Sequence, residues 1–170
     1  DFLAKHPSAT LDVVEIDPGV TALAKEYFNL SDSPRLNIYH QDGRTFLNEA
    51  PNKKYDAIYG DAFHSYFDVP FQLTTREAVQ KISSALTDTG VYIVNINASL
   101  GGAGSKFLQA EVATLQESFP QVYVLPVQST TDQIILQNIM LVALKSNKVP
   151  NWLMATGENA DFLASRLDHE

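Results

Sequence analysis

Short apolar runs alternate along the chain with segments in which apolar residues recur at helical spacing. The runs are rich in Val, Ile and Tyr and stop at charged, proline or glycine residues, as buried strands do. Strands are therefore predicted at 11–16, 36–39, 55–59, 91–96, 122–127 and 135–144. Helices are predicted at 18–28, 44–49, 74–86, 106–119 and, near the end of the chain, 159–167.

The order of these elements predicts the architecture. Strands separated by helices form a largely parallel sheet that helices cover on both faces. The last two strands have no helix between them, so we expect an antiparallel hairpin. No linker or repeat divides the 170 residues, and this length fits one domain. A single α/β domain is therefore expected over residues 1–170, with 150–170 as a tail that carries the short helix.

Two of the predicted helices have recognisable start signals. Asp17 precedes Pro18, a residue that suits the first helical position, so we expect Asp17 to cap that helix. Thr74 and Glu77 have the spacing of a capping box, so the helix at 74–86 is expected to begin there.

Composition narrows the classes of function. The chain has 12 basic and 20 acidic side chains, and its net charge of −8 argues against a nucleic-acid surface, because phosphates need Lys and Arg. The same charge is compatible with a small cationic substrate. The hydrophobic content of 45% is enough for a core and argues against a wholly disordered chain.

Missing residue types narrow these classes further. The absence of cysteine excludes a disulfide scaffold, a thiolate zinc site and a cysteine nucleophile, and it fits a cytoplasmic protein. The four histidines show no metal-binding spacing, so we expect no metal. The longest apolar stretch, 134–144, is shorter than the ~18 residues of a membrane-spanning helix. This segment is therefore expected to make no membrane contact.

Three acidic residues stand where predicted strands end, namely Glu15, Asp42 and Asp61. In sheets of this kind, ligands bind outside the carboxyl ends of the strands. A carboxylate there has to be solvated, paired or bound to a ligand, because an unpaired buried charge is costly. This placement is the main functional signal in the sequence.

The first two acids suggest a nucleoside site, and each has a structural alternative. Glu15 has the position of the acid that accepts hydrogen bonds from ribose hydroxyls, a role we favour over that of a solvated or helix-capping charge. Asp42, followed by Gly43, could accept a hydrogen bond from an exocyclic amine such as that of adenine. A simple Asp-Gly turn explains this pair equally well.

Asp61 precedes a loop rich in aromatic residues. It is a candidate general base, or a group that holds a cationic amine near the reacting centre. The loop could form a water-poor wall or a cation–π surface, or pack as an ordinary lid. Its aromatic residues are Phe63, Tyr66, Phe67 and Phe71. His64 could act as a base near neutral pH, but we favour a polar surface role for this lone loop histidine.

A glycine-rich segment follows the strand at 91–96. Gly101, Gly102 and Gly104 lack both the full G-x-G-x-x-G pattern and the Gly-Lys-Ser/Thr ending of a phosphate-binding loop. We therefore interpret the segment as a mobile loop near the site.

Five segments, in order, resemble the spermidine synthase family of the S-adenosylmethionine-dependent transferases. They are Val13–Pro18, Gln41–Leu47, Lys54–Asp61, Leu73–Glu77 and the stretch from Leu86 through Gly90 to Asn95. Order and spacing agree over residues 10–97, and more loosely as far as residue 144. One such motif is weak evidence, whereas five in order are specific for this superfamily.

The resemblance implies a Rossmann-like fold of the methyltransferase type, a co-substrate and residue roles. Glu15 would bind the ribose of decarboxylated S-adenosylmethionine, or of S-adenosylmethionine in a methyltransferase. Asp42, with Gly43, would lie against the adenine. Asp61 would match the catalytic aspartate that deprotonates or orients the attacking amine. The loop residues His64 and Tyr66 are the candidate substrate-binding residues.

The chain departs from the family pattern in the loop. Family members commonly have a second aspartate three positions after the catalytic one, and this second carboxylate helps to bind the diamine. Here that position is His64, followed by Ser65. The missing carboxylate weakens the case for a polyamine substrate, and the sequence resembles a divergent, synthase-like branch whose acceptor is not established.

A second departure concerns the start of the chain. The resemblance places a glycine-rich loop, at the end of a first strand, roughly 20 residues before the ribose acid. We therefore expect the chain to begin after that strand, which normally lies between the strands at 11–16 and 55–59. Those two strands would then leave a gap, pair directly, or accept another segment between them.

The leading hypothesis is aminopropyl transfer from decarboxylated S-adenosylmethionine to an amine such as putrescine. The alternatives are an S-adenosylmethionine-dependent methyltransferase and a non-catalytic nucleoside-binding or regulatory domain. The expected partner is a small-molecule amine and not a nucleic acid, and a homodimer is left open. This segment alone is expected to be inactive if its cofactor site is incomplete.

Overall fold

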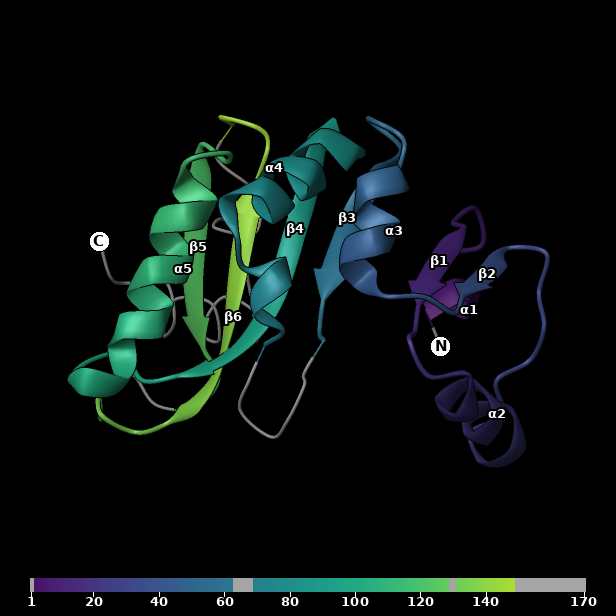
Figure 1. Cartoon of the computed structure of the whole chain (residues 1–170), viewed down its shortest axis with the longest axis horizontal. Helices are drawn as coiled ribbons and strands as arrows, with labels where there is room; N and C mark the ends of the chain where they lie inside the picture. Colours follow the sequence, from purple (N-terminus) through teal and green to yellow (C-terminus); the bar gives the residue numbers. More distant parts are fainter. Residues whose placement is uncertain (1, 63–68, 129–130, 149–170) are drawn as a thin grey trace. The chain divides into compact units, whose positions relative to one another are not determined.

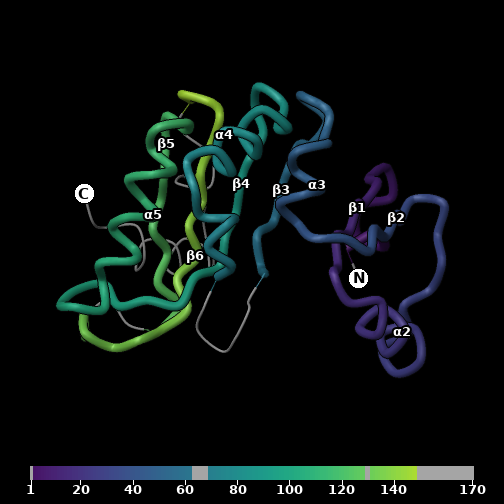
Figure 2. Tube along the Cα trace, in the orientation of Figure 1, coloured from purple at the N-terminus to yellow at the C-terminus, as the bar shows by residue number. Residues whose placement is uncertain are grey.

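A computed structural model describes residues 2–62, 69–128 and 131–148 of the chain. The chain divides into two compact units, Asp1–Ala50 and Pro51–Glu170. Figure 1 labels their helices and strands, and Figure 2 follows the same path as a tube. The predicted helix at 159–167 lies outside the described residues.

Residues 2–50 form one strand–helix–strand unit flanked by short helices. The elements are α1 (Phe2–Lys5), β1 (Leu11–Val14), α2 (Pro18–Tyr27), β2 (Leu36–Tyr39) and α3 (Gly43–Glu49). β1 and β2 pair in parallel, with Leu11 opposite Leu36 and Val14 opposite Tyr39. The Arg35 guanidinium donates hydrogen bonds to the carbonyl oxygens of Leu3, His6 and Ala9 and so ties α1 to this strand pair.

The start of α2 confirms the capping role predicted for Asp17. Its carboxylate accepts a hydrogen bond from the Gly19 N–H at 2.7 Å, and Pro18 is the first residue of the helix. The cap satisfies one of the backbone donors that a helix N-terminus leaves unpaired. The helix is therefore held in place at the end of β1 by local chemistry.

The second unit is a mixed sheet with two helices. Its elements are β3 (Tyr55–Gly60), η1 (Phe71–Leu73), α4 (Arg76–Ala85), β4 (Leu86–Ala98), η2 (Ala103–Ser105), α5 (Lys106–Gln116), β5 (Gln121–Pro126) and β6 (Gln137–Leu144). The strand order is β3-β4-β6-β5. β3 and β4 are parallel, whereas β6 is antiparallel to both β4 and β5. The predicted C-terminal hairpin is therefore confirmed.

The hydrophobic core of the chain lies in this second unit. Helices α4 and α5 lie on the same side of the sheet, as Figure 1 shows. The side chains that alternate toward them along β4 are buried: Tyr92, Val94, Ile96 and Ala98. Leu115 of α5 and Leu141 of β6 complete this core and are fully buried. The intervening β4 residues face the other side of the sheet.

Two local predictions need correction. The cap of α4 is Thr75, whose hydroxyl accepts a hydrogen bond from the Ala78 N–H, and not Thr74. The Thr74 hydroxyl instead donates to the Phe71 carbonyl oxygen and closes the preceding turn. β4 also begins at Leu86, earlier than predicted, because Leu86 pairs with Tyr55 before the register shifts.

The described strands form two hydrogen-bonded ladders. One joins β1 to β2, and the other joins β3, β4, β6 and β5. Direct pairing between the strands at 11–16 and 55–59, one of the three outcomes considered from the sequence, is not among these ladders.

Candidate functional site

Glu15 lies at the carboxyl end of the β1–β2 pair. Its backbone N–H donates to the Tyr39 carbonyl oxygen at 3.0 Å, so the residue continues the ladder past the end of β1. Its Oε1 accepts a hydrogen bond from the Asp17 N–H at 2.9 Å. Its Oε2 makes no hydrogen bond with the described residues. One carboxylate oxygen thus supports the turn into α2, and the other remains available to a ligand.

Asp42 follows β2 and caps α3, whose first residue is Gly43. Its Oδ1 accepts a hydrogen bond from the Thr45 N–H at 3.0 Å. Asp42 is therefore a helix cap, and not the simple Asp-Gly turn that the sequence analysis considered, while its adenine-binding role stays a prediction. Because β1 and β2 are neighbours, Asp42 and Glu15 lie at the same edge of their sheet.

Asp61 directly follows β3 and is exposed. Its Oδ1 accepts a hydrogen bond from the Nδ2 of Asn95 at 3.1 Å. Asn95 belongs to the neighbouring parallel strand β4 and had no site role in the sequence prediction. A sequence signal did exist, since Asn95 and Asn97 are the polar residues that interrupt an apolar strand.

Two buried amide oxygens of β4 lack hydrogen-bond donors among the described residues. They are the Oδ1 atoms of Asn95, whose Nδ2 donates to Asp61, and of Asn97, two residues further along the same face of the strand. Strand alternation places both residues on the face of β4 away from the helices. Buried amide oxygens are normally paired, so an unpaired one needs an explanation. Together with the Asp61 carboxylate, they form a set of acceptors that suits a ligand with N–H donors.

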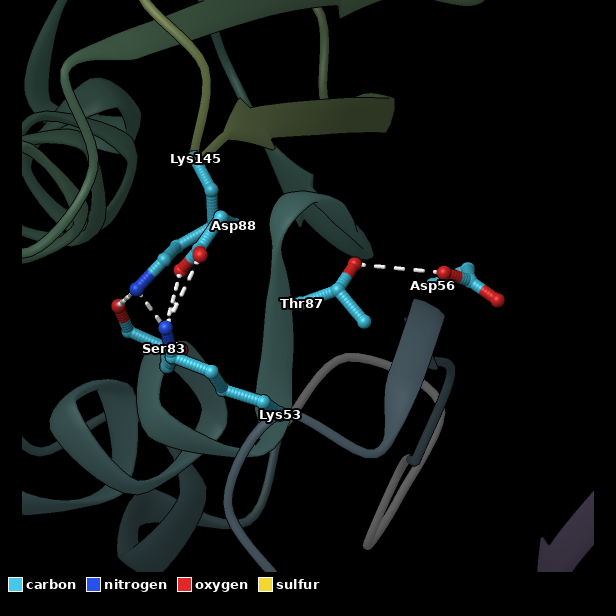
Figure 3. Close-up of polar contacts among 6 residues, drawn as sticks. All are labelled: Lys53, Asp56, Ser83, Thr87, Asp88 and Lys145. Atoms are coloured by element: carbon cyan, nitrogen blue, oxygen red, sulfur yellow. Dashed lines mark hydrogen bonds and ion pairs between the residues drawn. The ribbon is translucent and has the colours of Figure 1, made fainter.

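A separate polar network lies at the amino end of β4 (Figure 3). The Lys53 ammonium pairs with Asp88 at 2.8 Å, and the Lys145 Nζ donates to both the Ser83 hydroxyl and its carbonyl oxygen at 3.0 Å. The Thr87 hydroxyl donates to Asp56 at 3.3 Å.

The hydrogen bond and charge of Lys53 lower the pKa of Asp88, with a smaller contribution from Lys145. Both Asp56 and Asp88 therefore have structural partners at the end of the sheet opposite to Asp61.

The loops hold the remaining predicted residues. Phe63, His64, Tyr66 and Phe67 lie outside the described residues, so their roles stay predictions. Phe71 is exposed in η1. In the glycine-rich loop, the N–H of Gly101 donates to Gln133 and that of Ser105 to Gly102. These two amides serve the protein's own carbonyl oxygens, and the mobile loop near the site stays a prediction.

Within the described ranges, the chain has neither a metal-binding cluster nor a membrane-spanning helix. Residues 2–62, 69–128 and 131–148 contain no group of three or more His, Asp or Glu side chains placed to hold a metal ion. Over the same residues, the helices are too short or too polar to cross a bilayer. The cytoplasmic location stays a prediction.

The parallel strand–helix–strand unit, the acids at its strand ends and the antiparallel C-terminal hairpin define an α/β fold of the methyltransferase type. Two solved structures support this class. A probable spermidine synthase from Corynebacterium glutamicum has a TM-score of 0.78 at 22% identity, covering 94% of this chain and 55% of that one. Human methyltransferase-like protein 13, solved with SAH, has a TM-score of 0.71 at 24% identity, covering 99% of this chain and 76% of that one.

Sequence comparison then identifies the family. The model of the spermine/spermidine synthase domain matches residues 2–151, so the chain belongs to that family. A polyamine aminopropyltransferase from Vibrio vulnificus is 31% identical over 165 residues, which is 95% of this chain and 50% of the relative. The chain thus spans half the length of this curated relative.

Proposed function

We propose that the protein containing this chain transfers an aminopropyl group from decarboxylated S-adenosylmethionine to a small amine. The observation that carries the proposal is the cluster formed by Asp61 and the two asparagines of β4. It offers one carboxylate and two amide oxygens that no described residue pairs, and these acceptors suit the N–H groups of an amine. Family membership supports the same reaction class.

The residues present fit the nucleoside part of the donor. One carboxylate oxygen of Glu15 has no hydrogen bond with the described residues, and this oxygen can accept from ribose hydroxyls. The Oδ1 of Asp42 caps α3, whereas its Oδ2 has no hydrogen bond within the described ranges and can accept from an adenine amine. When bound, the donor supplies an aminopropyl carbon attached to a sulfonium, which is a good leaving group.

The reaction is an in-line displacement at that carbon. The neutral amine nitrogen attacks, a C–N bond forms and the C–S bond breaks. The electron pair of the broken bond goes to sulfur, which leaves as the neutral thioether methylthioadenosine. The new ammonium loses its proton to Asp61, and then to water. Asn95 holds the carboxylate in place, so the protein contributes mainly positioning.

Methyl transfer from S-adenosylmethionine is the second candidate. His64 stands where family synthases have a second aspartate for the diamine, and this departure favours an acceptor other than a diamine. Glu15 and Asp42 do not separate the two reactions, because both donors contain the same adenosine. The difference lies in which group leaves the sulfonium, so product analysis decides between them.

The role of Asp61 can be tested in the full-length protein with the Asp61→Asn variant. Asparagine has almost the same size but cannot take a proton. We expect turnover with decarboxylated S-adenosylmethionine and putrescine to fall ~10²–10⁴-fold, the range of general-base catalysis. Affinity for methylthioadenosine, measured by calorimetry, should stay close to that of the unmodified protein.

Asp56→Asn is the matched control. Asp56 lies on the same strand, at its other end, and accepts a hydrogen bond from Thr87. We expect this variant to keep its turnover. Equal turnover in both variants would remove Asp61 from the reaction, and a full-length protein that binds neither nucleoside would refute both transfer reactions.

A further inference from the structure

Gly60 is the last residue of β3 and directly precedes Asp61. A Cβ atom at this position would lie 2.6 Å from the Tyr92 hydroxyl oxygen and 3.2 Å from two carbons of its ring. The backbone φ of Gly60 is not positive. Among the glycines of the described residues, Gly102 is the one with the positive φ that favours glycine. Space, rather than backbone conformation, therefore accounts for a glycine before Asp61.

Tyr92 has little freedom to move away from this contact. It is only 4% exposed, and its ring stacks on that of Phe119 at a centroid distance of 6.3 Å. The residue opposite Tyr92 in the β3–β4 ladder is Ile58, so the side chain reaches two residues further along β3 to touch Gly60. The end of β3 thus lies against a rigid aromatic side chain.

The Tyr92 hydroxyl is a neutral group in this setting. Burial, together with the nearby carboxyl of Glu111, raises the pKa of the phenol above its ordinary value. Because the phenol keeps its proton, it is not a candidate base. Its influence on Asp61 has to act through contact with the backbone at Gly60.

Two residues of β4 therefore hold the end of β3 from opposite faces of the sheet. Tyr92 packs against Gly60 on the face that the helices cover, and Asn95 donates to the Asp61 carboxylate on the other face. We propose that Tyr92 is a positioning residue, which acts through Gly60 to set the location of Asp61. This inference rests on the proposed function, since it assumes that Asp61 takes part in the reaction.

The test is a pair of substitutions in the full-length protein. In Gly60→Ala, the new methyl group overlaps the Tyr92 hydroxyl, so β3 has to shift and carry Asp61 with it. A displacement near 1 Å can lower turnover ~10²-fold, and we expect kcat to fall by about that factor. The KM for decarboxylated S-adenosylmethionine should change little.

Adding Tyr92→Phe should rescue the variant. Without the hydroxyl oxygen, the nearest contacts of the new methyl group are the ring carbons at 3.2 Å, which need a shift of only a few tenths of an ångström. We expect the Gly60→Ala/Tyr92→Phe double variant to recover most of the kcat that Gly60→Ala loses. A double variant no faster than Gly60→Ala would overturn the proposal.

Gly90→Ala controls for general strain. Its Cβ would lie 2.9 Å from the Cβ of Leu86. This contact is at the amino end of β4, whereas Asn95, the partner of Asp61, lies toward the carboxyl end of the strand. We expect this variant to lose stability without a selective loss of kcat. A fall in kcat equal to that of Gly60→Ala would show that strain anywhere in the sheet lowers activity, and would contradict a role specific to Tyr92.

A readout that does not depend on turnover separates this inference from the proposed function. The carboxyl carbon of Asp61 can be observed by NMR in each variant at one fixed pH. We expect Gly60→Ala to shift its resonance and the double variant to restore it. If Asp61→Asn keeps full turnover while this pattern holds, the proposed function fails and the contact remains. An unshifted Asp61 resonance in Gly60→Ala would refute the contact itself.

If Gly60→Ala does not fold, Tyr92→Leu takes its place. The shorter side chain removes the contact with Gly60 without creating an overlap. We expect a lower kcat and a shifted Asp61 carboxyl resonance in a folded protein, and an unchanged kcat would overturn the proposal.

Discussion

The two units of the chain hold their candidate residues in different ways. In the first unit, none of the residues 2–50 is buried, and the apolar side chains of α2 are largely exposed, with Leu23 at 53%. In the second unit, α4 and α5 cover one face of a four-stranded sheet and bury a continuous core. Caps and turns therefore position Glu15 and Asp42, whereas tertiary packing positions Asp61.

This difference predicts which residues tolerate change. A side chain held by a local hydrogen bond can be replaced at the cost of that bond. A side chain held by tertiary contacts depends on residues that are remote in sequence, such as Tyr92 and Asn95 for Asp61. We therefore expect the position of Asp61 to be sensitive to substitutions remote from it in sequence, and the positions of Glu15 and Asp42 to be sensitive mainly to substitutions within their own caps and turns.

The largest contrast should appear in stability. Leu141 of β6 is fully buried, and Leu141→Ala should lower the free energy of unfolding by about 2–5 kcal/mol, the usual range for a core leucine. Leu23→Ala, on the exposed face of α2, should change it by less than about 0.5 kcal/mol. Denaturant titration of the chain of residues 1–170 measures both. Similar losses in the two variants would show that α2 is packed as tightly as the sheet.

The raised pKa of Glu111 predicts how the stability of the second unit depends on pH. Its carboxyl is buried in α5, and burial raises its pKa from 4.5 to about 7. The folded state therefore binds this proton more tightly than the unfolded state. Stability should fall as the pH rises from about 4.5 to about 7 and then level off, with a total loss on the order of 3 kcal/mol.

Glu111→Gln keeps the shape of this side chain and removes its charge. We expect the variant to be more stable than the unmodified protein at pH 8 and equally stable at pH 4, as followed by thermal unfolding. A variant that follows the pH dependence of the unmodified protein would place the titrating group elsewhere.

Two substitutions of Asp42 can separate its structural role from its proposed binding role. Asp42→Ala removes the cap of α3 and should lower stability by about 1 kcal/mol. Asp42→Asn keeps the cap, because asparagine caps helices as well as aspartate does, but it removes the charge. If Asp42 contacts adenine, the Asn variant should bind methylthioadenosine more weakly at unchanged stability. Unaltered affinity would leave Asp42 with the cap alone.

The smallest effect is expected at the exposed pair of Lys53 and Asp88. The pKa of Asp88 is lowered, so any stabilisation is present above the ordinary aspartate pKa of 3.8 and is lost as the pH falls through the lowered value. Exposed ion pairs contribute little to the free energy of unfolding. Lys53→Met should therefore leave the unfolding midpoint nearly unchanged at pH 7, and a marked loss would show a larger structural role for this network.

Features that depend on neighbouring residues in the chain could be predicted from the sequence. The cap at Asp17 and the three acids at strand ends follow from short motifs, so they could be read without a structure. The cap of α4 was misplaced by one residue, because the adjacent Thr74 and Thr75 are equally good caps and the turn at Phe71 decides between them. The early start of β4 was missed because it depends on pairing with Tyr55.

The remaining site features depend on register between strands. Asn95 reaches Asp61 only because β3 and β4 pair in parallel with Gly60 opposite Val94. The contact between Tyr92 and Gly60 has the same origin. Sequence spacing cannot give this register, since a shift by one residue would move each of these side chains to the other face.

The most direct test of the account is product analysis with the full-length protein. The protein would be given decarboxylated S-adenosylmethionine and S-adenosylmethionine together with an amine such as putrescine, and the products identified by mass spectrometry. The account predicts an aminopropylated amine and an equal amount of methylthioadenosine, with both lost in Asp61→Asn. A methylated amine together with S-adenosylhomocysteine, formed in place of these products, would contradict it.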